Sequence, residues 1–143
     1  MELPQNYSAG ANAKPLGNVT LAVTGLPSLE SAAPKEFGGP GDQWSPEDLL
    51  VAAVADCFVL SFRAIAAASK FEWLDLSCQA TGKLDKVDRA IQFTELNITA
   101  ILTVAAGTDE SRAQRLLEKA EQACFITNSL KCTAHLHAKV VMA

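Results

Sequence analysis

The chain has 143 residues, of which 49% are hydrophobic and 20% are charged, and its formal net charge is -4 at pH 7. Such a length and composition are typical of one soluble globular domain with a substantial core, so we expect a single domain over residues 1–143. The acidic balance and the lack of a basic run argue against nucleic acids and anionic membranes as partners. No basic segment followed by an apolar run opens the sequence, so we expect no secretory signal and a cytoplasmic location.

The pattern predicts a short strand over residues 19–23. Apolar residues alternate there with Thr and Ala, as in a half-buried strand, whereas the residues before it show no clear period. Residues 32–44 then contain three glycines and two prolines, so we expect a loop.

A long central helix is predicted over residues 45–70. Ser45 is the expected N-cap, and Glu47 and Asp48 lie in the first turn, where the helix dipole favours negative charge. Nearly every following side chain is apolar, so most of the helix surface must be covered. The length would allow a membrane span, but charged residues interrupt the run and alanine contributes little to insertion, so we expect no membrane partner.

The next two strands are predicted over residues 73–84 and 91–104. Apolar and polar residues alternate in both, and the polar residues between them favour an antiparallel pair. The apolar set of the second strand changes phase near Phe93 and Thr94, which indicates a bulge.

A second helix, capped by Thr108 or Asp109, carries one apolar stripe that continues to Cys124. A last strand over residues 133–141 follows it. The order of elements predicts an α+β domain with a mostly antiparallel sheet.

The four cysteines are Cys57, Cys78, Cys124 and Cys132. Cys78 is in phase with the apolar residues of its strand, and a buried free cysteine is most often a small core residue. Cys57 and Cys124 lie on apolar faces of two different helices. They can form a disulfide if their Cα atoms come within about 7 Å, which periodicity does not decide.

Three segments resemble the OsmC/Ohr family of osmotically inducible and organic-hydroperoxide-resistance proteins. They are Ala-Pro-Lys-Glu-Phe-Gly-Gly-Pro-Gly at 33–41, Ser-Pro-Glu-Asp-Leu-Leu-Val-Ala-Ala-Val-Ala-Asp-Cys-Phe at 45–58, and Leu-Leu-Glu-Lys-Ala-Glu-Gln-Ala-Cys at 116–124, followed by Thr-Asn-Ser-Leu at 127–130. The resemblance covers nearly the whole chain after the first of these. It implies an OsmC-like α+β fold, with antiparallel sheets wrapped around two central helices in an intertwined homodimer and the sites at the subunit interface.

The resemblance also implies an activity and its residues. Cys57 matches the peroxidatic cysteine, Cys124 the resolving cysteine, and Glu47 the acidic residue that orients an arginine. The implied reaction reduces an organic hydroperoxide to an alcohol, through a sulfenic acid on Cys57 and a Cys57–Cys124 disulfide. An external dithiol, which is a lipoylated protein in one branch of the family, then reduces the disulfide, and no cofactor is implied.

Glu47 is far from Cys57 along the helix. Ten residues of a straight helix rise about 15 Å, too far for the carboxylate to serve the thiol of its own helix. Glu47 therefore acts either through a kink or in the site of the other subunit, and the second option predicts an obligate dimer.

The sequence departs from the family pattern at one position that matters for the chemistry. The family's peroxidases place an arginine in the N-terminal strand region, whereas no arginine precedes Arg63 here. Lys14 and Lys35 are the candidate substitute cations, although lysine cannot reproduce the planar fork of a guanidinium. Asp56 adds a charge of the wrong sign beside Cys57.

Two functional hypotheses follow. In the first, the chain is a homodimeric peroxidase whose alkyl pocket involves Phe58, Phe62 or Phe125. In the second, motivated by the missing arginine, it is a non-enzymatic relative that senses redox state or binds a small ligand.

A metal site is the weaker interpretation of the last cysteine and the two histidines. His135 and His137 share the polar face of the last strand, while Cys132 is out of phase with them and near a turn. Three ligands without a fourth rarely hold a metal, so we expect a solvated strand face and no metal.

Overall fold

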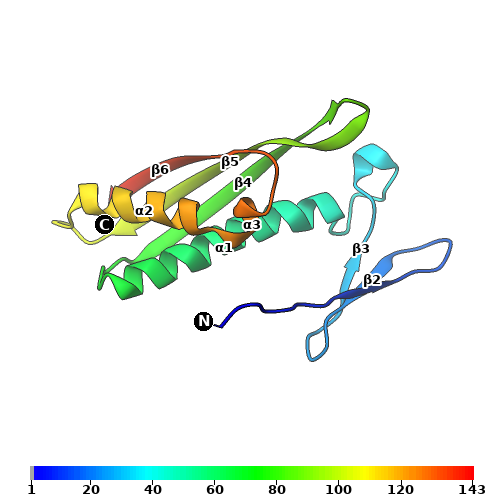
Figure 1. The fold of residues 1–143 in the computed structure, drawn as a ribbon, viewed down its shortest axis with the longest axis horizontal. Helices are drawn as coiled ribbons and strands as arrows, with labels where there is room; N and C mark the ends of the chain where they lie inside the picture. The colour runs from blue at the N-terminus through cyan, green and yellow to red at the C-terminus, as the bar shows by residue number, and fades with distance from the viewer. Residues whose placement is uncertain (1) are drawn as a thin grey trace. The chain divides into compact units, whose positions relative to one another are not determined.

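The computed structural model describes residues 2–143, which form two compact units that divide after Leu50. The longest helix, α1 (Pro46–Ala68), begins in the first unit and continues through the second (Figure 1). The fold is α+β, with one three-stranded sheet in each unit.

The first unit contains a small antiparallel sheet of β1 (Gly10–Asn12), β2 (Val19–Ala22) and β3 (Leu29–Ser31), with β2 in the middle. The strand predicted over residues 19–23 is confirmed as β2. The sequence did not reveal β1 and β3, because strands of three mostly exposed residues leave no readable alternation.

The connection between β3 and α1 is a tight loop that contains the short 3-10 helix η1 (Lys35–Phe37). A side chain at Gly39 would place its Cβ 1.6 Å from the carbonyl oxygen of Ala33, so only glycine allows this approach. The backbone then passes β3, where the N–H of Ala32 donates to the carbonyl of Trp44 at 2.9 Å.

No apolar side chain of residues 2–50 is buried; the buried residues of this segment are Ser31 and Ser45. The first unit therefore has no hydrophobic core of its own. Its sheet must be covered by other protein surface to be stable.

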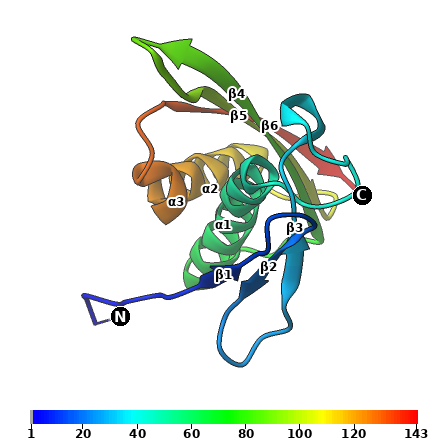
Figure 2. The same cartoon turned by 90° about the vertical axis from the view of Figure 1, so that its right-hand side faces the viewer.

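The second unit has two layers. Its sheet joins β4 (Asp75–Val87), β5 (Ala90–Val104) and β6 (Ala134–Met142), with β5 in the middle. The second half of α1 and the later helices lie on the same face of this sheet (Figure 2). The β4–β5 pair is antiparallel, whereas β6 pairs in parallel with β5, because the chain crosses over through helices before it returns to the sheet.

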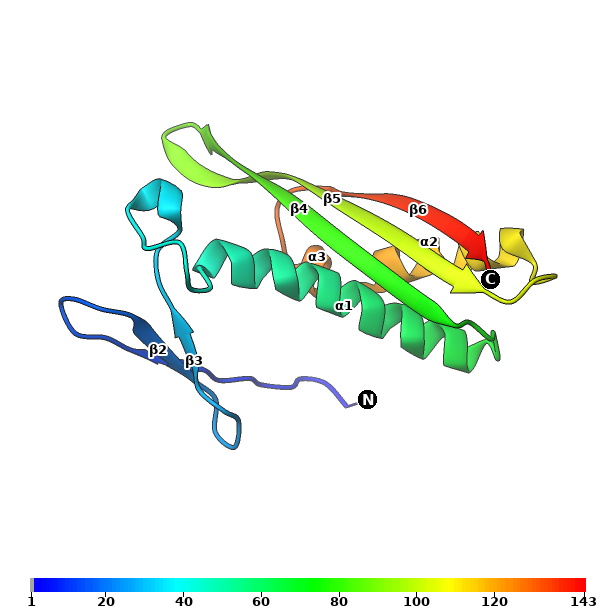
Figure 3. The same ribbon diagram turned by 180° about the vertical axis from the view of Figure 1, so that it is seen from behind.

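The β4–β5 hairpin extends past α2 (Glu110–Ala123) and α3 (Phe125–Asn128) (Figure 3). Its two-residue turn, Asp88 and Arg89, has φ angles of 49° and 74°, as the turns that match strand twist require. The strands therefore extend further than the polar residues 85–90 suggested.

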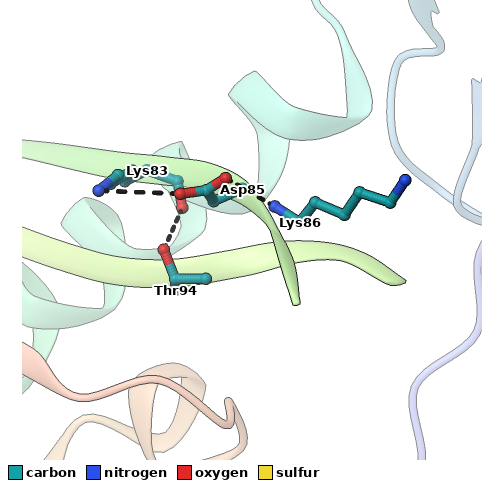
Figure 4. Close-up of polar contacts among 4 residues, drawn as sticks. All are labelled: Lys83, Asp85, Lys86 and Thr94. Atoms are coloured by element: carbon teal, nitrogen blue, oxygen red, sulfur yellow. Dashed lines mark hydrogen bonds and ion pairs between the residues drawn. The ribbon is translucent and has the colours of Figure 1, made fainter. Parts of the chain in front are cut away.

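The bulge predicted near Phe93 and Thr94 is confirmed. Lys83 pairs with Glu95 and the next residue of β4 pairs with Phe93, so Thr94 is the extra residue. Its hydroxyl donates to the carbonyl of Lys83 at 3.4 Å, and the Lys83 ammonium lies 3.9 Å from the carboxylate of Asp85 (Figure 4). The bulge restores the phase in which the apolar residues of β5 face the helices.

The core of the second unit lies between the sheet and the helices. Its buried side chains follow the predicted stripe on α2 and the predicted alternation on β5, whereas on α1, for which no single stripe was predicted, every fourth residue is buried. They are Val54, Phe58, Phe62 and Ala66; Ala113, Leu116, Leu117 and Ala120; and Leu96, Ile98, Ala100, Leu102 and Val104.

Both long helices begin at their expected caps. Ser45 and Asp48 form a reciprocal pair, because the Asp48 N–H donates to Ser45 Oγ at 3.0 Å and the Ser45 N–H donates to Asp48 Oδ2 at 3.2 Å. At α2, Asp109 accepts a hydrogen bond from the N–H of Arg112 at 3.1 Å. These bonds satisfy amide groups that a helix leaves without internal partners.

Replacing Ser45 with alanine removes this cap, and we expect a loss of about 1 kcal/mol of folding free energy. In a thermal melt at fixed protein concentration, this corresponds to a fall of about 3 °C in Tm. Ser28→Ala, at an exposed loop residue, is the matched control. Equal melting temperatures for the two variants would show that the reciprocal cap does not stabilise α1.

Candidate redox site

Cys57 lies half-buried in the middle of α1. Ser61, one helical turn later, has its hydroxyl 3.9 Å from the Cys57 sulfur. The i, i+4 spacing of an α-helix places these two side chains on one face.

Cys124 stands at the junction between α2 and α3. Its backbone is extended, with φ -67° and ψ 112°, so it ends one helix and precedes the first residue of the next. Its carbonyl accepts from the N–H of Asn128 at 3.0 Å and from the hydroxyl of Thr127 at 3.2 Å. The first amide groups of α3, at Phe125 and Ile126, have no acceptor within a preceding helical turn and remain available to another group.

The Cys57 sulfur lies near those amide groups, which affect its pKa. Burial works to raise the pKa of Cys57, but hydrogen bonds from the backbone N–H groups of Ile126 and Phe125 and from the side chains of Cys124 and Ser61 outweigh it. The pKa of Cys57 is therefore lowered from its ordinary value. Hydrogen bonds to the charged form of a thiol favour the thiolate, which is the nucleophilic species.

Cys124 has the opposite character. Burial is the main cause that raises its pKa, hydrogen bonds from Thr127 oppose this in part, and a hydrogen bond with Cys57 and the charge on Cys57 raise the pKa further. The site thus pairs a thiol that ionises readily with a buried neighbour that keeps its proton. This division of roles suits a cysteine that attacks first and a cysteine that responds second.

Cys78 lies on β4 and packs against the core. Burial, together with the nearby Cys124, raises its pKa to about 11. A thiol with this pKa is almost entirely protonated at neutral pH, in agreement with the core interpretation.

Glu47 lies in the first turn of α1, where its side chain lines a cavity of about 740 Å³ formed by residues of the first unit. Its Oε2 atom is buried and has no hydrogen-bond partner among residues 2–143. Neither Lys14 nor Lys35 forms an ion pair with it, since the one ion pair within the described chain joins Lys83 and Asp85. The substitute-cation role of these lysines stays a prediction.

The three candidate pocket residues have different environments. Phe58 and Phe62 have no exposed area, so a substrate cannot contact them directly in this structure. Phe125, in contrast, is 64% exposed. Phe62 also packs edge-on against Trp73, with ring centroids 5.4 Å apart. Their contact with a substrate is a prediction that remains open.

His135 and His137 lie on the polar side of β6, as predicted. Both are exposed, and His137 Nε2 lies 3.0 Å from Asn97 Oδ1 across the strand pair. In the part of the chain that the structure describes, no three His, Cys, Asp or Glu side chains are placed to hold a metal ion.

The sequence predicted a pairing of Cys57 with Cys124, whose side chain contributes to the pKa of Cys57 in the structure, but it did not predict the backbone groups that lower this pKa. The N–H groups of Phe125 and Ile126 belong to the backbone, so no particular residue type indicates their role. The available signal was Ser61, one turn after Cys57 on the same helix.

We expect Cys57 to be the first thiol alkylated by iodoacetamide at pH 7 and Cys78 to be the last, because thiolate content controls the rate. Ser61→Ala removes one hydrogen bond to the thiolate, which raises the pKa of Cys57 and slows its alkylation about threefold. Ser77→Ala, on an exposed strand position, should leave the rate unchanged. Peptide mapping by mass spectrometry follows each cysteine, and faster labelling of Cys78 or Cys132 than of Cys57 would refute this account of the site.

Two sequence relatives cover most of the chain. The uncharacterized protein YmaD of Bacillus subtilis (strain 168) is 26% identical over 106 residues, which cover 72% of this chain and 71% of YmaD. The organic hydroperoxide resistance protein of Xanthomonas axonopodis pv. citri (strain 306) is 29% identical over 133 residues, 87% of each chain.

The fold also matches a solved structure. An OsmC-like protein of unknown function from Vibrio cholerae aligns with a TM-score of 0.86 at 19% identity, covering 95% of this chain and 100% of the other. The family model described as OsmC-like protein matches residues 39–139, a segment that includes both site cysteines. The chain therefore belongs to the OsmC-like family and has its fold.

Proposed function

We propose that the chain is a thiol-dependent peroxidase that reduces organic hydroperoxides to alcohols. The observation that carries the proposal is the lowered pKa of Cys57 next to Cys124, in a family with a relative named for organic hydroperoxide resistance. A thiolate beside a second thiol provides a nucleophile and the means to complete the cycle.

The cycle begins at the sulfur of Cys57. The thiolate attacks the terminal oxygen of the hydroperoxide, the O–O bond breaks, and the alkoxide takes a proton and leaves as the alcohol. Cys57 is left as a sulfenic acid. The Cys124 thiol then attacks the Cys57 sulfur, water leaves, and a disulfide forms. A dithiol donor, for which a lipoylated protein is our candidate, reduces this disulfide and becomes a disulfide itself.

The amides of Phe125 and Ile126 stabilise the thiolate of Cys57 electrostatically, as an arginine would otherwise do. An arginine lowers a thiol pKa with a full charge, whereas backbone N–H groups do so with partial charges held at fixed positions. The missing arginine therefore does not remove the thiolate. Glu47 has no cation to orient among the described residues, and we assign it no step in the reaction.

The proposed active form is a homodimer. The first unit lacks a buried apolar side chain, and only 22% of the most apolar window of α1 is buried, although this helix is long and apolar enough to span a membrane. Leu60 on α1 is 50% exposed. A second copy that covers α1 and the small sheet would remove both apolar surfaces from water.

The first test follows turnover of cumene hydroperoxide with a dithiol donor. We expect activity in the wild type, a loss of at least about a thousandfold in Cys57→Ser, because the hydroxyl of serine is a far weaker nucleophile than a thiolate, and failure of Cys124→Ser to turn over repeatedly. Cys132→Ser is the matched control and should keep full activity.

If the wild type consumes no hydroperoxide, or if Cys57→Ser is as active as the wild type, the peroxidase proposal is wrong. The first result would favour the ligand-binding alternative, for which the unpartnered carboxylate of Glu47 is the supporting observation.

The second test measures the oligomeric state by light scattering after size exclusion. We expect a mass of about twice 15.2 kDa for the wild type. Leu60→Glu places an unpaired charge on the proposed contact face of α1, so we expect a shift to monomer. Ile101→Glu, on the opposite face of the sheet, should remain dimeric. A monomeric wild type would contradict the proposal.

A further inference from the structure

The helix α3 is a single turn of four residues, and little burial stabilises it. An isolated helical turn is unstable in water, because too few backbone hydrogen bonds offset the loss of conformational freedom. Thr127 is the one buried residue of α3, Ile126 packs partly against the core, and Phe125 is 64% exposed. The stability of α3 therefore depends on the bonds that its polar groups form with their surroundings.

Two hydroxyl groups bond to carbonyl groups of the α3 segment. The hydroxyl of Thr127 donates to the carbonyl of Cys124 at 3.2 Å, and the hydroxyl of Ser129 donates to the carbonyl of Phe125 at 2.8 Å. Both bonds end on carbonyl oxygens, so they do not involve the N–H groups at the start of the turn. Those N–H groups need a different acceptor.

The thiolate of Cys57 and the start of α3 stabilise each other. Burial acts to raise the pKa of Cys57, whereas the N–H groups of Ile126 and Phe125 lower it, so the folded turn favours the charged sulfur over the neutral one. By thermodynamic linkage, the charged sulfur favours the folded turn to the same extent. A disulfide with Cys124 makes the sulfur of Cys57 neutral, and the N–H groups of α3 then lose the anion that they face.

We propose that α3 is a redox-dependent switch, which is folded while Cys57 is a thiolate and unfolds locally once Cys57 and Cys124 form a disulfide. The unfolded segment directly follows Cys124 in the chain, so its unfolding gives a dithiol donor access to the disulfide. Access of the attacking thiol is one of the factors that control the rate of disulfide reduction. The inference rests on the disulfide of the proposed function and adds a conformational step to it.

The experiment is hydrogen–deuterium exchange of the full-length protein at pH 7, followed by mass spectrometry, before and after oxidation with diamide. Diamide takes two electrons and two protons from a pair of thiols and becomes a hydrazine, so the disulfide forms whether or not the protein is a peroxidase. We expect the amides of residues 124–130 to exchange about fivefold faster after oxidation, since one lost hydrogen bond changes an opening equilibrium by that order. The amides of residues 91–104 should exchange at the same rate in both states.

Two variants separate the loss of the thiolate from other effects of oxidation. Reduced Cys57→Ser has a neutral hydroxyl in place of the thiolate, so residues 124–130 should exchange faster than in the reduced wild type, and diamide should cause no further change. Cys132→Ser keeps both site cysteines, and it should show the full difference between the reduced and oxidised states.

Linkage also predicts the reverse effect, which a variant outside the thiol pair measures. Ser129→Ala removes the hydrogen bond to the carbonyl of Phe125 and weakens α3, so the pKa of Cys57 should rise and its alkylation at pH 7 should slow about twofold. Ser111→Ala, at an exposed residue of α2, is the matched control and should leave the rate unchanged. Thermal melts show whether each variant is folded.

Unchanged exchange of residues 124–130 after the Cys57–Cys124 disulfide has formed would overturn the switch and leave the peroxidase proposal intact. Failure of diamide to form this disulfide, or an unchanged alkylation rate of Cys57 in Ser129→Ala, would also overturn it. Faster exchange in a protein that consumes no hydroperoxide would support the switch while the peroxidase proposal fails, so the two failures are distinguishable.

Discussion

The redox chemistry that we propose depends on the backbone amide groups at the start of α3, which lower the pKa of Cys57. Burial alone would leave Cys57 a protonated core thiol, as it does Cys78, whose pKa is raised to about 11. The backbone amides of Ile126 and Phe125 reverse the sign of the shift, and the side chains of Cys124 and Ser61 add to it. The difference between a raised pKa at Cys78 and a lowered pKa at Cys57 thus depends on which backbone N–H groups lie near each sulfur.

The backbone N–H groups of Phe125 and Ile126 are available because α2 ends and α3 begins at Cys124. If α2 had continued, the amides of residues 125 and 126 would have bonded to carbonyls one turn earlier. The extended backbone of Cys124 instead makes Phe125 and Ile126 the first residues of a new helix. One residue therefore does two things: its side chain approaches Cys57, and its backbone conformation releases the amides that stabilise the Cys57 thiolate.

The sequence predicted the parts of the fold that have a distinctive residue pattern. The caps at Ser45 and Asp109, the apolar stripe of α2 and the bulge at Thr94 were all readable, because each leaves a regular or locally distinctive residue pattern. β1 and β3 were not, since they are short and exposed. The parallel pairing of β6 was also missed, because pairing direction depends on the path of the chain rather than on residue types. At the site, the two sulfurs were readable from spacing and family resemblance, whereas the activating amides have no sequence signal.

The most direct test of the redox account is the disulfide itself. The reduced protein is treated with one equivalent of cumene hydroperoxide, quenched with an alkylating agent, digested without reductant and mapped by mass spectrometry. The account predicts a peptide pair linked through Cys57 and Cys124, with Cys78 and Cys132 recovered in alkylated form. Recovery of Cys57 as a free, alkylated thiol, or its linkage to a cysteine other than Cys124, would contradict it.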